Sequence, residues 1–235
     1  MTVTVDPTVA PIVDPTTRSV DRRRLPPAPL LLGGVVASVV VLVPIVYIGV
    51  RATDRGWGPF VDTLWRRRTL DLTFRSAELA VVVTVLSAVL GIACAWVVAR
   101  TDVPLRSFWR VALAMPLAVP SYIAAWAWIG WRSDLAGFRG AVLVLTTISY
   151  PYVYLPVLAA LRRADPALAE VARSSGRSPL QAFVTVTLRQ VRIAAFGGCV
   201  LVALYTLSEF GAVSIMRYET LTKVIYTSYR AAFDR

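Results

Sequence analysis

The chain has 235 residues, of which 57% are hydrophobic, and its mean hydropathy is +0.63. A soluble domain of this length needs less apolar surface, so the composition favours a membrane protein. The formal net charge of +11 comes almost entirely from arginine. In a bilayer protein, arginines lie mainly in loops beside lipid head groups, so the charge does not indicate nucleic-acid binding. The absence of histidine excludes histidine-ligated zinc and Ser-His proteolysis, and we predict neither a catalytic set nor a metal site in this chain.

The N-terminal segment, residues 1–27, is rich in Thr, Val, Pro and Asp and contains Arg22-Arg23-Arg24. This composition predicts a disordered tail that ends at a positively charged anchor on the cytoplasmic side. A cleaved signal peptide is the alternative. The apolar run that follows is longer than a signal core and begins late in the chain, which favours a membrane anchor.

Five apolar runs follow, each with at most one charged residue, at about 28–50, 76–99, 111–131, 140–161 and 193–216. A helix of about 20 residues crosses roughly 30 Å of hydrocarbon, so each run is long enough to span a bilayer. None shows the alternation of a β-barrel strand. The predicted fold class is therefore all-α: a polytopic helical membrane protein with its membrane domain over 28–235. At the start of the second span, Arg75 and Glu78 are one helical turn apart and are predicted to pair.

Prolines gather in the third and fourth predicted spans, at Pro116, Pro120, Pro151 and Pro156. Each removes a backbone hydrogen bond and should kink its helix. Membrane helices tolerate proline more often than soluble ones do, but four in neighbouring spans favour helices deformed around a translocation cavity. The polar side chains that could satisfy the freed carbonyl groups are Ser121, Tyr122, Ser149 and Tyr150.

Glu209 is the only acidic residue deep within a predicted span. A charge in hydrocarbon is costly, so the side chain should face protein or water. Two interpretations stay open: a place in the transport pathway, where it could help to pass a cation, or hydration at the outer interface.

The most informative segment is polar and covers residues 162–192. Asp165-Pro166 predicts an N-cap with proline in the first turn. Gly176 is placed to end that helix, and Ser178 and Gln181 have the spacing of a capping box for a second helix. Two organised helices outside the bilayer indicate a docking surface for a partner.

The residues Glu170, Val171, Ala172, Gly176 and Leu188 have the spacing of the cytoplasmic "EAA" loop, and the segment resembles that loop in binding-protein-dependent ABC importer permeases. It departs from the family pattern at three positions: Val171, Val186 and Arg189 replace an alanine, an isoleucine and a proline. Two further stretches, 116–122 and 208–214, are similar to the ferric-iron branch of the family. The likeness runs from about residue 28 to the end of the chain.

The resemblance implies a type I importer permease in the plasma (inner) membrane, with a cytoplasmic N-terminus. Loop 162–192, including Phe183, would couple the spans to a cytoplasmic ATP-binding subunit. The other implied partners are an extracytoplasmic substrate-binding protein and a second permease half or subunit. The sequence contains no phosphate-binding loop, since its only lysine, Lys223, follows a threonine. We therefore expect that this chain is not an enzyme and binds no cofactor, and that the partner uses the ATP.

Ferric iron is the expected substrate, although permeases for thiamine, phosphonate, sulfate and polyamines share the loop. The permease unit of the family has six spans, and five are predicted here, so we expect the first half of a longer permease. A secondary transporter or channel is the alternative function. It would favour several ionisable residues at mid-bilayer and an inverted repeat, neither of which is evident.

Overall fold

The computed structural model describes residues 28–53, 56–165 and 167–233, so the predicted tail over 1–27 lies outside it. The chain forms two compact units, one ending at Val61 and the other beginning at Asp62. All regular secondary structure in the described residues is helical, which confirms the predicted all-α class. Four of these helices, or five if one sharply bent pair counts as a span, are long and apolar enough to cross a membrane.

The first unit contains α1 (Ala28–Thr53) and most of α2 (Trp57–Leu64), joined through Gly56 with φ +89°. The apolar run of α1 has no hydrophilic face, and its side chains from Leu31 to Arg51 are exposed. A helix that is apolar all round needs a hydrocarbon or protein environment, so α1 has the character of the predicted first span.

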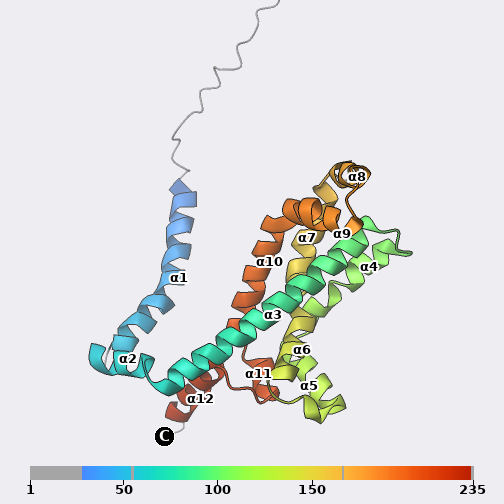
Figure 1. Cartoon of the computed structure of the whole chain (residues 1–235). Helices are drawn as coiled ribbons and strands as arrows, with labels where there is room; N and C mark the ends of the chain where they lie inside the picture. The colour runs from blue at the N-terminus through green and yellow to red at the C-terminus, as the bar shows by residue number, and fades with distance from the viewer. Residues whose placement is uncertain (1–27, 54–55, 166, 234–235) are drawn as a thin grey trace, which may run out of the picture. The chain divides into compact units, whose positions relative to one another are not determined.

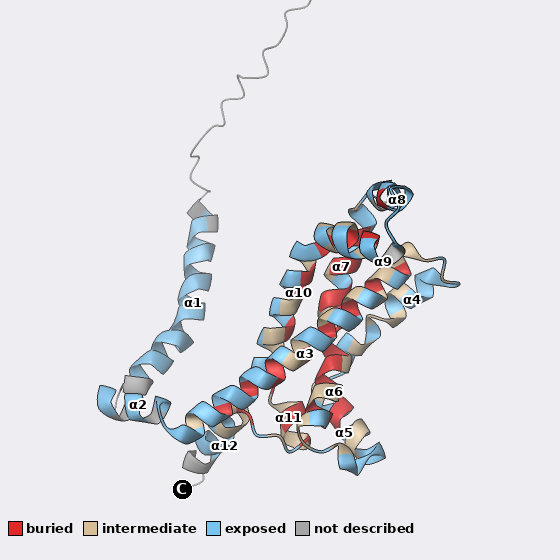
Figure 2. Ribbon diagram, viewed as in Figure 1, coloured by how far each residue is buried: buried red, intermediate tan, exposed pale blue. Residues whose placement is uncertain are grey.

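The second unit is built on α3 (Arg67–Arg100), α7 (Pro151–Arg163) and α10 (Leu188–Ser208), which contact one another pairwise (Figure 1). Their buried residues face inward (Figure 2). Glycine permits the close approach: a Cβ on Gly198 would lie 2.7 Å from the Cα of Val153, and a Cβ on Gly91 would lie 2.9 Å from the Tyr154 nitrogen. Small residues at membrane-helix contacts allow this backbone proximity.

The fourth predicted span is present as α6 (Phe138–Ser149) followed by α7, which together form one helical span over Phe138–Arg163. Pro151 occupies the first position of α7, where its missing N–H costs little. The second predicted span is present in α3. This helix begins earlier than expected, at Arg67, because its first turns contact α12 (Leu221–Phe233), where the Leu221 N–H donates to Ser76 Oγ at 2.9 Å.

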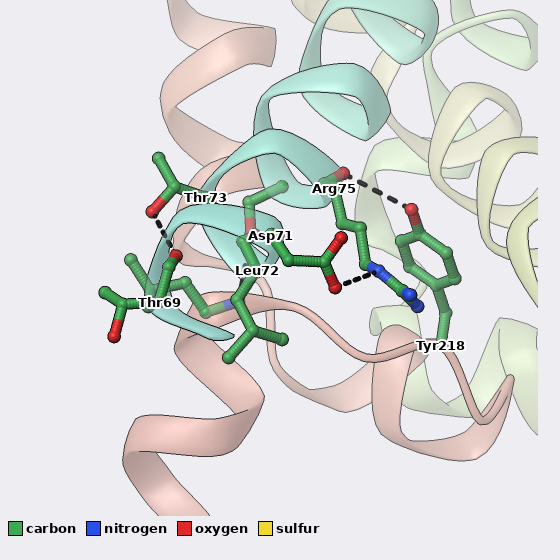
Figure 3. Close-up of polar contacts among 8 residues, drawn as sticks. Thr69, Asp71, Leu72, Thr73, Arg75 and Tyr218 are labelled. Carbon is green, nitrogen blue, oxygen red and sulfur yellow. Dashed lines mark hydrogen bonds and ion pairs between the residues drawn. The ribbon is translucent and has the colours of Figure 1, made fainter. Parts of the chain in front are cut away.

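The start of α3 shows a different ion pair from the predicted one. Arg75 Nε lies 2.9 Å from Asp71 Oδ2, one turn earlier, and the predicted pairing of Arg75 with Glu78 is wrong. The Arg75 carbonyl accepts the Tyr218 hydroxyl at 3.4 Å, and Thr73 donates to the Thr69 carbonyl (Figure 3). A tyrosine from the segment before α12 thus contacts the first turns of α3.

The third predicted span, 111–131, is not a continuous helix. It comprises α4 (Arg106–Ala112), the 3₁₀ helix η2 (Met115–Ala118) and α5 (Ser121–Trp131), with a bend of 92° before Ser121. Pro116 lies in η2, and Pro120 is the extended residue that precedes α5. The two prolines therefore border a break instead of sharing one helix face. A short 3₁₀ helix, η3 (Ser133–Leu135), connects α5 to α6.

The fifth predicted span, 193–216, has different ends in the structure. The helix enters from the polar loop as a π-helical turn, η4 (Phe183–Thr187), continues as α10 and stops at Ser208. Glu209 and Phe210 interrupt it before the short helix α11 (Gly211–Ile215). Arg217, with φ +57°, then turns the chain toward α12.

Candidate functional site

The polar loop contains the two helices that the sequence predicts, α8 (Ala167–Ser174) and α9 (Pro179–Ala182). Asp165 Oδ1 accepts the Ala167 N–H at 2.9 Å; Pro166 lies outside the described residues. At the other end the Arg177 N–H donates to the Ala172 carbonyl at 3.2 Å, and the Gly176 N–H donates to the Arg173 carbonyl at 3.0 Å. These two bonds, with φ +85° at Gly176, form a Schellman motif.

The second helix begins with the predicted capping box. The Ser178 N–H donates to Gln181 Oε1 at 3.1 Å, and the Gln181 N–H donates to Ser178 Oγ at 3.2 Å. These two reciprocal bonds satisfy backbone donors that a helix start otherwise leaves free. Local hydrogen bonds therefore fix both helices of the loop.

Helix α8 leaves apolar side chains exposed. Leu168 is 53% exposed and Val171 is 62% exposed, and Glu170 is exposed as well. Ala172, by contrast, is buried, and Figure 2 shows α8 largely in the exposed colour. Leucine and valine on an otherwise polar loop indicate a contact surface for another protein.

A cavity of about 300 Å³ lies under α8, between it and the end of α3. Glu170 and Arg173 of α8 line one side, and Arg100 and Asp102 line the other. The Arg100 guanidinium donates to the Leu161 and Ala164 carbonyls at 3.2 and 3.1 Å. It therefore joins the end of α3 to the end of α7 and satisfies carbonyl groups left free there.

The loop is attached to α3 and runs directly into α10. The Phe183 ring meets the Trp96 ring edge-on, with centroids 5.6 Å apart. Leu188, the first residue of α10, packs against the buried core. The structure thus gathers the residues of the predicted coupling loop at one end of the helix bundle: Glu170, Val171, Ala172, Gly176, Phe183 and Leu188.

The predicted pathway residues fall into two groups. Ser121 and Glu209 come together, since Ser121 Oγ donates to Glu209 Oε1 at 2.8 Å. The same carboxylate oxygen accepts the Ala212 N–H at 2.9 Å, and Glu209 is 8% exposed. Pro120 lies next to this pair, and Tyr122 is largely exposed. The other predicted residues, Pro116, Pro151 and Pro156, lie in η2 and α7.

Beside Ser121 is a second cavity, of about 250 Å³, which Tyr152 and Tyr205 also line. The sequence analysis did not single out these two tyrosines. Each is a phenol within an apolar run, and a buried tyrosine hydroxyl usually needs a polar partner; that signal could have identified them.

The carbonyl groups freed by the break near Pro116 find partners on α7 and at the residue just before it. The Tyr150 hydroxyl donates to the Leu113 carbonyl at 2.7 Å, and the Tyr154 hydroxyl donates to the Arg110 carbonyl at 3.2 Å. Of the predicted donors, Tyr150 therefore has the expected role. Ser149 bonds within its own helix instead.

Residues 87–229, from the middle of α3 into α12, match the model of the family described as binding-protein-dependent transport system inner membrane component. The chain belongs to this family. The match covers more than half of the chain, and it includes both the capped loop and the broken helix. Members of the family are membrane-embedded transport subunits, so the chain is a permease component and not an enzyme.

Two relatives show the range of the family. The chain is 35% identical over 211 residues to the Fe(3+)-transport system permease protein FbpB 2 of Haemophilus influenzae, a match that covers 90% of this chain and 42% of the relative. It is 29% identical over 210 residues to the sulfate transport system permease protein CysW of Escherichia coli K12, covering 81% of this chain and 72% of the relative. The chain thus spans less than half the length of the iron permease that it matches.

Proposed function

We propose that this permease component is the membrane-spanning part of an ATP-driven importer for ferric iron. It would accept the metal from an extracytoplasmic binding protein, with a second permease half or subunit completing the translocation path. ATP would be hydrolysed by a separate cytoplasmic subunit, because the sequence lacks a phosphate-binding loop. The chain itself would bind no cofactor.

The observation that carries the proposal is the exposed apolar pair Leu168 and Val171 on a firmly capped helix. Helix α8 contacts η4, and η4 continues into α10. A partner that moves α8 would therefore move α10 and, through the Phe183–Trp96 contact, α3. Such rigid displacement of packed helices is a common mechanism of alternating access.

The iron assignment is supported by the relative with the higher identity, whose printed function is Fe(3+) transport. The sulfate permease matches at lower identity. Docking of the ATP-binding subunit at α8 would place the loop, and with it the N-terminus, on the cytoplasmic side.

Cysteine crosslinking tests the docking surface. In a chain in which Cys94 and Cys199 are replaced by alanine, Val171→Cys should crosslink to the co-expressed ATP-binding subunit. Ile225→Cys on α12, which is exposed to a similar degree at 61%, should not. Labelling of Val171→Cys in intact cells by a membrane-impermeant maleimide would contradict the cytoplasmic placement.

The turn at Gly176 provides a second test. Gly176→Val should weaken co-purification of the ATP-binding subunit, because a β-branched residue is strained at positive φ. Gly176→Asn should retain it, since asparagine tolerates this conformation. Iron uptake that persists without any ATP-binding subunit would instead identify a secondary transporter.

A further inference from the structure

The cavity beside the broken helix is lined by eight residues, three of which have hydroxyl groups. Its apolar residues come from the segment 117–120 and Ile148, and its polar side chains are Ser121, Tyr152 and Tyr205. The two tyrosine rings are in contact, with centroids 5.7 Å apart. No arginine or lysine contributes to the wall in the described part of the chain.

The buried carboxylate of Glu209 lies next to the residues that line this cavity. Glu209 is hydrogen bonded to Ser121, and the Tyr205 hydroxyl neighbours both side chains. Glu209 lies in the break between α10 and α11, and Ser121 begins the eleven-residue helix α5. The carboxylate thus occupies the place at a helix N-terminus where an anionic ligand would otherwise be stabilised.

This arrangement separates two classes of substrate. A sulfate ion would meet the Glu209 carboxylate beside a cavity whose wall has no basic side chain in the described residues, so it would be repelled. A hard metal cation would find one carboxylate and three hydroxyl oxygens, the ligand type that such cations prefer.

We propose that the cavity lined by Ser121, Tyr152 and Tyr205, with the Glu209 carboxylate behind it, is a transit site for a hard metal cation. This inference rests on the proposed function and deepens it, because it gives a location to the cation and a reason to exclude oxyanions. In the site the cation replaces the Ser121 hydroxyl as the partner of Glu209. No group of three or more Cys, Asp or Glu side chains able to hold a metal occurs in the described residues. Binding is therefore weak, as passage through a transporter requires.

The position of the site suits the entrance of a pathway. Helix α10 begins at the polar loop and ends just before Glu209, and its 21 residues correspond to about 30 Å. The site therefore lies at the end of the bundle opposite the coupling loop. A cation accepted there has the length of the membrane still to cross.

Terbium(III) luminescence tests the site in the 235-residue chain purified in detergent. Tb³⁺ is a hard trivalent cation that binds oxygen, and tyrosines at the site sensitise its emission. We expect emission from the unmodified chain, a decrease in apparent affinity of tenfold or more in Glu209→Gln, and a severalfold decrease in Tyr205→Phe. Glu219→Gln removes an exposed carboxylate near the same end of the bundle and should have no effect.

Equal affinity in the unmodified chain, Glu209→Gln and Tyr205→Phe would overturn the proposal, and so would binding of radiolabelled sulfate to the unmodified chain. If Glu209→Gln fails to elute as a folded species, Tyr205→Phe and Ser121→Ala decide the question. The measurement needs neither an ATP-binding subunit nor a binding protein. A negative result would thus remove the transit site alone, whereas failure of the Val171→Cys crosslink would remove the proposed function.

Discussion

The rings of Trp96 and Phe183 meet edge to face, with their planes at 75° and their centroids 5.6 Å apart. Trp96 lies near the end of α3, and Phe183 is the first residue of the π-helical turn that leads into α10. This contact joins two of the three central helices at the end where the coupling loop lies. Under the proposed function, this contact would transmit a movement of the loop to α3.

Replacement of Phe183 by alanine should weaken the coupling of ATP hydrolysis to uptake. The edge-to-face contact contributes about 0.5–1.5 kcal/mol beyond buried area, so we expect a severalfold decrease in uptake with ATP hydrolysis retained. Phe74→Ala, which removes a ring exposed on α3, is the matched control. The measurement is uptake and ATPase activity in vesicles with the complete transporter; an equal fall of both activities would argue against a role in coupling.

Gly198→Val should destabilise the helix bundle strongly, whereas Gly197→Val should not. A Cβ on Gly198 would lie 2.7 Å from the Tyr152 carbonyl oxygen, while a Cβ on Gly197 would meet nothing within 4 Å. Overpacking of this kind costs about 1–3 kcal/mol. Thermal unfolding in detergent, followed by fluorescence, should show a lower midpoint for Gly198→Val only; similar midpoints would mean that α7 and α10 can separate freely.

Tyr150→Phe should destabilise the broken helix. Loss of the hydroxyl leaves the Leu113 carbonyl without its 2.7 Å donor, and an unsatisfied buried polar group costs about 1–3 kcal/mol. Hydrogen exchange of the amides in α4 and η2 should accelerate. Tyr226→Phe, which alters a tyrosine exposed on α12, controls for removal of a hydroxyl. Unchanged exchange in Tyr150→Phe would mean that water replaces the phenol.

The ion pair that follows α5 gives a prediction about pH. Hydrogen bonding to the Arg132 guanidinium lowers the pKa of the Asp134 carboxyl, and the two groups are 2.6 Å apart at closest. A carboxyl whose pKa is lower in the folded state contributes stability above its unfolded pKa, about 3.9, and loses it as pH falls through the folded value. The difference in unfolding midpoint between the unmodified chain and Asp134→Asn should therefore be constant above about pH 4 and shrink below it.

High salt should reduce the same difference at neutral pH, because both side chains are exposed and their attraction is screened. A difference that is independent of both pH and salt would show that Asp134 acts through its backbone position and not through its charge.

The features of the loop that are fixed by neighbouring residues could be predicted from sequence. The Ser178–Gln181 capping box and the turn at Gly176 are both present, because each depends on hydrogen bonds within a few residues. The apolar runs could also be recognised from the sequence, because the thickness of the hydrocarbon layer sets the length that each run must have.

The interruptions of the helices could not be predicted in the same way. Hydropathy continues through Pro120 and through Glu209, so the sequence predicted whole spans at 111–131 and 193–216. The breaks are stabilised by distant partners: Ser121 meets Glu209, 88 residues away, and Leu113 meets Tyr150, 37 residues away. Nothing within a single run indicates which other run supplies the hydrogen bond.

Glu209 Oε1 accepts from Ser121 at the start of α5 and from the Ala212 backbone in α11. Because one carboxylate oxygen bonds both helix starts, a shift of either interruption would strain the hydrogen bond to the other. The two breaks are therefore linked through Glu209. A ligand that competes for this oxygen would weaken the hydrogen bonds at the starts of α5 and α11 together.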